Sequence, residues 1–84
     1  MNEIYEILSN LRPEFNFRDS SDFVEDGYLD SFDIISLVST LEEKYQVKIA
    51  GIDVIPENFC SVDAITALIK KSGGTISGNM ENEQ

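Results

Sequence analysis

The longest patterned stretch of this 84-residue chain is SFDIISLVSTLEEKY, residues 31–45. At 100° per residue, its apolar side chains share one broad face, which is typical of an amphipathic helix. These side chains are Ile34, Ile35, Leu37, Val38, Leu41 and Tyr45. Asp30 stands directly before the stretch and can cap its first turn, where the helix dipole also favours the carboxylate of Asp33. The pattern therefore predicts a helix from Ser31 to Tyr45.

Two shorter helical patterns lie on either side of this stretch. Near the start of the chain, Ile4, Ile7, Leu8 and Leu11 form one apolar stripe at helical spacing. Asn2 can cap this helix, and Pro13 marks its end, because the residue before a proline avoids the helical region. Near the end, residues 56–59 are typical of a single helical turn opened by proline. Cys60 or Ser61 then begins a last helix, which Gly73 and Gly74 stop.

The connections between these helices carry weak strand signals. Residues 14–29 show no period but contain several aromatic side chains, so we expect a long loop that packs across the domain. Loops of this length are uncommon in compact domains and are often functional. Residues 47–49 are too short to found a sheet. We therefore predict one all-α domain over residues 1–72 and a disordered tail over residues 73–84.

Composition and charge exclude several classes of function. The chain has 6 Lys and Arg against 16 Asp and Glu, a net charge of −10, which disfavours nucleic acids and anionic membranes. No apolar run approaches the roughly 18 residues of a membrane span. Histidine is absent, so hydrolytic triads and zinc sites are disfavoured. The single cysteine, Cys60, fits a reducing cytoplasmic location and is interpreted as a small buried group.

One aromatic residue does not fit the core of the central helix. Phe32 lies roughly 150° from the centre of the apolar face, on a side shared with Ser36, Ser39 and Glu43. Either the long loop folds over it, or it is a contact surface for a partner. Its neighbour Ser31 lies where a helix N-terminus suits a phosphate. Spacing alone makes this a weak phospho-acceptor hypothesis.

The stretch FVEDGYLDSFD, residues 23–33, resembles the modification motif of acyl carrier proteins. In that family, a Glu-Asp pair, a glycine and a hydrophobic residue lead into Asp-Ser-Leu. Residues 34–45 are similar to the family's second helix, with its Leu-Glu-Glu and closing aromatic. Residues 55–59 and 61–65 resemble its short third helix and the start of its fourth. The likeness covers about residues 3–71.

This resemblance implies a fold and a function. The fold would be a four-helix bundle with a short third helix and a long first loop. Ser31 would carry 4′-phosphopantetheine from coenzyme A, a covalent cofactor whose thiol holds acyl or aminoacyl groups as thioesters. Asp30 would help to bind the metal of the loading enzyme. The carrier itself would catalyse nothing.

The resemblance also implies partners. Phe32 occupies the position of the family's exposed leucine, and with it the expected partner-binding residues on the second helix are Asp33, Ser36, Ser39 and Glu43. The expected partners are a phosphopantetheinyl transferase and an adenylating ligase or acyltransferase, and the carrier is expected to be a monomer. The form of residues 27–31 is closer to carriers of D-alanine or other amino acids than to fatty-acid carriers.

Two other interpretations compete with the carrier. If Gly27 took the sixth position of a calcium-binding loop, Asp22 and Asp26 would fit positions one and five. The third position would then be Val24, which cannot ligate, and the twelfth would be Asp33 rather than glutamate, so this site is disfavoured. The second alternative is an unmodified acidic helical adaptor that binds proteins.

Overall fold

All secondary structure in residues 3–74, the part of the chain that the computed structural model describes, is helical. The elements in chain order are α1 (Glu3–Leu11), η1 (Phe17–Asp19), α2 (Ser31–Tyr45), η2 (Gly51–Asp53), η3 (Pro56–Asn58) and α3 (Val62–Lys71), where η denotes a 3-10 helix. The predicted all-α class is confirmed for these residues, as is the predicted turn near Pro56. The cap assigned to Asn2 and residues 75–84 of the tail predicted over residues 73–84 lie outside the described residues.

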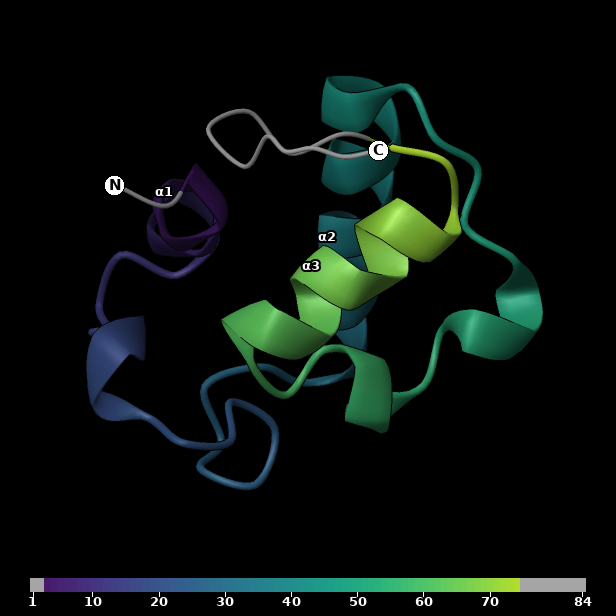
Figure 1. The fold of residues 1–84 in the computed structure, drawn as a ribbon. Helices are drawn as coiled ribbons and strands as arrows, with labels where there is room; N and C mark the ends of the chain where they lie inside the picture. Colours follow the sequence, from purple (N-terminus) through teal and green to yellow (C-terminus); the bar gives the residue numbers. More distant parts are fainter. Residues whose placement is uncertain (1–2, 75–84) are drawn as a thin grey trace.

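Local hydrogen bonds close several ends of the three α-helices. Figure 1 shows α3 in front of α2, with α1 to one side of both. The central helix α2 ends without a glycine, because Gln46 itself takes the left-handed conformation at φ 56° and donates its backbone N–H to Glu42. The last helix α3 begins after Ser61, whose side chain accepts a hydrogen bond from the N–H of Ala64. The end of α2 and the start of α3 are therefore closed by local bonds.

The first loop, residues 12–30, contributes to the core as much as a helix does. Phe17, Phe23 and Leu29 are each no more than 2 % exposed. The rings of Phe17 and Phe23 meet edge to face with centroids 5.1 Å apart, and those of Phe15 and Tyr28 stack at 4.5 Å. Such aromatic pairs add to the free energy gained by burying the rings. The prediction that this loop packs across the domain is confirmed.

Further contacts tie the loop to the rest of the chain. The Arg18 guanidinium lies 4.0 Å from the centre of the Tyr5 ring in α1. Further along the loop, the backbone N–H of Phe23 donates to the carbonyl of Cys60, 2.7 Å away. Cys60, interpreted from the sequence as a small buried group, is only half-buried, and its thiol donates to the carbonyl of Glu57. The loop is thereby fixed to α1 and to the segment before α3.

One residue of the central helix was assigned to the wrong side. Ile34, Leu37 and Leu41 are buried as predicted, but Ile35 is 60 % exposed. Side chains two positions apart on a helix differ in direction by roughly 200°, so Ile35 points away from the core that Leu37 faces. The buried stripe of α2 is narrower than its apolar pattern indicates. No helix among residues 3–74 is long and apolar enough to cross a bilayer.

Candidate functional site

Ser31 is the first residue of α2 and is exposed to solvent. Within residues 3–74, its hydroxyl has no hydrogen-bond partner. The hydroxyl is therefore free to react, at a helix end where the dipole favours a negative group. The predicted position of Ser31 at the start of the helix is confirmed.

The two carboxylates next to Ser31 form a capping box. The Asp30 Oδ1 accepts from the backbone N–H of Asp33 at 3.0 Å, and the Asp33 Oδ2 accepts from the backbone N–H of Asp30 at 3.1 Å. The bond from the Asp33 N–H holds the pKa of the Asp30 carboxyl below its usual value, so Asp30 stays ionised. Its side chain is still 62 % exposed. Asp30 therefore fixes the helix start through Oδ1 while most of its carboxylate stays exposed.

Arg12, which the sequence did not point to, completes this arrangement. Its Nε and Nη2 atoms each lie 3.0 Å from the Asp33 Oδ2, and Nη2 lies 3.7 Å from the Asp30 Oδ2. Its Nη1 donates to Glu14 at 2.9 Å. The bond to Asp33 also raises the pKa of Arg12, so the guanidinium stays charged. No sequence spacing connects residues 12 and 33, which meet only because α1 ends beside the start of α2.

Asp33 is consequently a largely buried residue with a structural role. The residue is 8 % exposed, and its carboxylate is used by Arg12 and by the capping box. It was expected among the partner-binding residues, but the structure leaves it little surface for a partner. The carboxylate instead joins the end of α1 to the start of α2.

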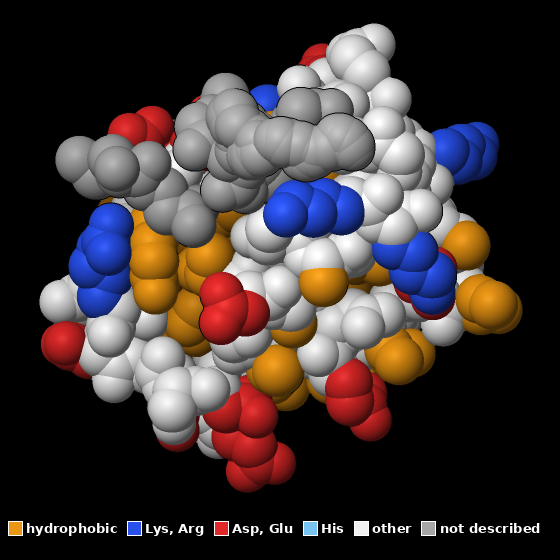
Figure 2. All heavy atoms as spheres, in the orientation of Figure 1, with side chains coloured by type: hydrophobic (Ala, Val, Ile, Leu, Met, Phe, Trp, Pro, Cys, Tyr) orange, Lys and Arg blue, Asp and Glu red, His pale blue; other side chains and the backbone are white. Residues whose placement is uncertain are grey.

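The loop that leads to Ser31 is held by its own acidic side chains. Asp22 accepts from the backbone N–H groups of Val24 and Glu25, and Asp26 accepts from the Ser20 hydroxyl at 2.6 Å. Gly27 takes a positive φ of 80°, a conformation that glycine adopts at little cost. On the face seen in Figure 2, acidic side chains lie along the lower edge, where Figure 1 places this loop. The approach to Ser31 is therefore both ordered and negative.

The side of α2 that faces away from the core carries the remaining predicted residues. We name it the α2 outer face, and it consists of Phe32, Ile35, Ser36, Ser39 and Glu43, all exposed. Phe32 is 80 % exposed, so the loop does not fold over it. Steps of three and four residues place all five side chains on one side of the helix. Two apolar side chains thus stand beside Ser31, with polar ones further along.

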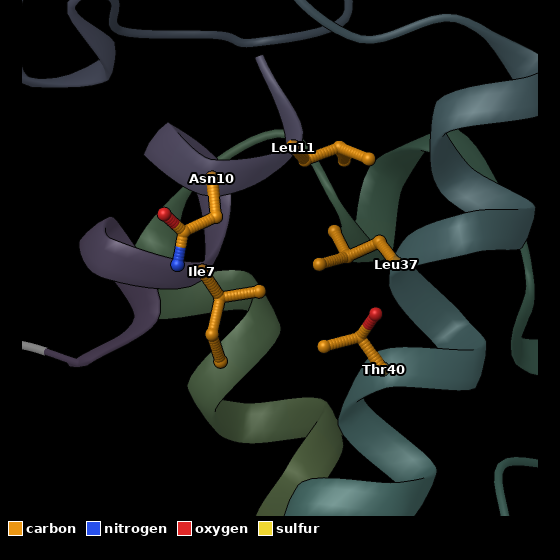
Figure 3. A pocket seen from close by; sticks show the side chains of 5 residues that line it. All are labelled: Ile7, Asn10, Leu11, Leu37 and Thr40. Carbon is orange, nitrogen blue, oxygen red and sulfur yellow. The ribbon is translucent and has the colours of Figure 1, made fainter. Parts of the chain in front are cut away.

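The groove seen in Figure 3 is separate from this site. It lies between α1 and α2, has a volume of about 250 Å³, and is lined by Ile7, Asn10, Leu11, Leu37 and Thr40. This volume is below the roughly 300 Å³ at which ligand pockets commonly begin. Among the described residues, no three His, Cys, Asp or Glu side chains are placed to hold a metal ion together.

The site at Ser31 is therefore an exposed hydroxyl at an ordered helix start. Such a surface can accept a covalent group or contact another protein. Comparison with protein-family models, with curated proteins and with solved structures found no match for this chain.

Proposed function

We propose that this protein is an acyl carrier protein in which Ser31 bears a 4′-phosphopantetheine arm. The observation that carries the proposal is the free, exposed Ser31 hydroxyl at the capped start of α2. Helix order adds support. The long first loop of a carrier bundle has its counterpart in residues 12–30, and the short third helix has its counterpart in η3.

The residues around Ser31 suit a phosphodiester. The group would add one negative charge at a helix N-terminus, where the dipole favours it. The nearby negative charge of Asp33 is balanced by Arg12 at 3.0 Å, so the new charge would not meet two uncompensated carboxylates. When bound, the arm supplies a terminal thiol that holds acyl or aminoacyl groups as thioesters.

Loading requires a separate transferase and coenzyme A. The Ser31 Oγ attacks the phosphorus that bears the pantetheine, and a new oxygen–phosphorus bond forms. The bond from that phosphorus to the bridging oxygen breaks, and adenosine 3′,5′-bisphosphate leaves with the electron pair. A base on the transferase takes the serine proton. The exposed carboxylate of Asp30 would help to bind the transferase's divalent metal.

The partners follow from the surface next to Ser31. Phe32 and Ile35 offer apolar contact area, and Ser36, Ser39 and Glu43 surround them with polar groups. The net charge of −10 would draw basic enzymes toward the carrier and would speed their encounter at low salt. The proposed partners are a phosphopantetheinyl transferase and an adenylating ligase or acyltransferase. D-Alanine and other amino acids are the first cargoes to test.

Intact mass tests the assignment directly. The purified protein is incubated with coenzyme A, Mg²⁺ and a promiscuous phosphopantetheinyl transferase, and we expect a gain of one phosphopantetheine group. Ser31→Ala should abolish this gain. Ser9→Ala is the control, because this serine is exposed on α1, away from the α2 outer face, and it should load normally. No gain in the wild type, or a gain that survives Ser31→Ala, would refute the carrier function.

A second candidate is an unmodified protein-binding adaptor, which the exposure of Phe32 and Ile35 favours. An adaptor would bind its partners through the α2 outer face without any group on Ser31. Its partners would then bind Ser31→Ala as tightly as the wild type, and the wild type would gain no mass.

A further inference from the structure

The contacts of Arg12 connect the end of α1 with both carboxylates next to Ser31. We propose that Arg12 is a positioning residue for the loading of Ser31, an inference that rests on the proposed carrier function. It would act through Asp33 and Asp30, which it contacts, and not by contact with coenzyme A. Each link of this chain of contacts is a short distance in the structure.

The base of the Arg12 side chain is fixed. Its backbone N–H donates to the carbonyl of Leu8 at 2.9 Å, which continues the hydrogen bonding of α1 by one residue, and Pro13 follows directly. The guanidinium then reaches a residue 21 positions further along the chain. Arg12 therefore determines where the start of α2 lies relative to α1.

The Asp33 carboxylate connects Arg12 to the backbone of Asp30, the residue before Ser31. The same oxygen, Oδ2, that receives two guanidinium nitrogens also accepts from the backbone N–H of Asp30. If Arg12 is removed, Asp33 loses its counter-charge while it is still largely buried. The capping box that spans Ser31 would then loosen, because one of its two acceptors would have to move toward water.

Arg12 also changes the local charge that an incoming anion meets. Residues 19–33 contain six acidic residues and no Lys or Arg, so Arg12 supplies the positive charge from outside this segment. The pyrophosphate of coenzyme A is itself anionic and must come within bonding distance of Ser31. A cation at 3.0 Å from Asp33 and 3.7 Å from Asp30 lowers the repulsion along this approach.

The loosened capping box and the stronger repulsion of coenzyme A would affect the reaction at Ser31 more than docking of the transferase. The described contacts of the guanidinium are all with carboxylates at the junction of α1 and α2, whereas the docking residues lie on the α2 outer face. Loss of Arg12 should therefore lower kcat for loading and leave the KM for the carrier nearly unchanged.

The test compares three variants of the full chain. Arg12→Met removes the charge and keeps a long side chain. Arg12→Lys keeps the charge but not the planar fork. Lys71→Met is the matched control, because it breaks another described ion pair, that of Lys71 with Asp53 at 2.8 Å, which does not involve Ser31. Loading by the transferase is followed by mass at a temperature at which circular dichroism shows each variant folded.

We expect Arg12→Met to lower kcat about tenfold or more, with KM changed less than about twofold. The kcat of Arg12→Lys should lie between those of Arg12→Met and the wild type. This variant also keeps the test available if Arg12→Met does not fold. Lys71→Met should load like the wild type. Any one of three results would overturn this inference and leave the carrier function standing. They are a normal kcat in Arg12→Met, an equal loss of kcat in Lys71→Met, and no recovery of kcat in Arg12→Lys. If the wild type is not loaded, the carrier function fails and this inference fails with it.

Discussion

Replacement of Asp33 by asparagine removes one charge at the start of α2 and keeps the shape of the side chain. The Asp33 carboxylate is 11 % exposed and accepts from Arg12 Nε, Arg12 Nη2 and the Asp30 N–H, all at 3.0–3.1 Å. In the Asp33→Asn variant, the oxygen can still accept these bonds, but it is neutral. The variant therefore isolates the contribution of the charge.

The size of the effect follows from the two contacts with Arg12. A hydrogen bond to a charged group contributes about 1.5–3 kcal/mol, and one between neutral groups about 1 kcal/mol. The two contacts with Arg12 should each weaken by about 1 kcal/mol when the acceptor loses its charge. We expect the free energy of unfolding to fall by about 2 kcal/mol, which lowers the Tm of a domain of this size by about 8–16 °C.

Urea and thermal unfolding followed by circular dichroism measure this loss. Glu14→Gln is the matched control, because Glu14 receives the same guanidinium at 2.9 Å but its side chain is 52 % exposed. An exposed pair is screened by solvent, so the Tm of this variant should change by less than about 2 °C. If both variants lose the same stability, or if Asp33→Asn loses none, the argument that burial of the Asp33 pair stabilises the helix junction is refuted.

Three further predictions concern packing, titration and backbone conformation. Phe23→Ala should cost about 3–5 kcal/mol in urea unfolding, because the ring is 1 % exposed, whereas Phe32→Ser, at 80 % exposed, should cost less than about 0.5 kcal/mol. Equal losses would contradict this packing. Burial and the 2.6 Å bond to Glu3 raise the pKa of Tyr45, so the stabilisation by its hydroxyl is complete below the unfolded pKa of about 10 and is lost as pH rises further. The stability difference between the wild type and Tyr45→Phe should therefore shrink above about pH 10, and a constant difference would disprove the link. Gly27→Ala should cost about 1 kcal/mol because φ is +80°, although its Cβ would contact nothing, and an unchanged Tm would argue against this strain.

The features that could be predicted from sequence depend on neighbours along the chain. The bounds of α2, its cap at Asp30 and the turn at Pro56 follow from helical period and from capping residues. Each of these features is fixed within a few residues, so the local pattern contains the required information. The angle of Phe32 to the buried stripe places it outside the core of α2, but the sequence left open whether the loop covers it, and only the structure shows that it is exposed.

The features that were missed depend on how helices lie against one another. The pairing of Arg12 with Asp33 requires the end of α1 to meet the start of α2, which no local pattern specifies. Ile35 is apolar yet exposed, because the packing of the other elements against α2 determines how wide its covered side is. Gln46 ends α2 in the left-handed conformation, although glycine is the usual residue there.

The contact between Arg18 and the Tyr5 ring also determines how the folded chain meets a protease. Arg12 precedes Pro13, so Arg18 is the one trypsin site between residues 12 and 43. Its side chain is drawn over an aromatic ring, and its backbone is held within a 3-10 turn. Trypsin therefore cleaves after Arg18 only when the loop has opened, so the cleavage rate at this bond depends on the fraction of molecules in which the loop is open. A brief digestion thus reports how firmly the first loop is closed, on any variant and without a spectroscopic label.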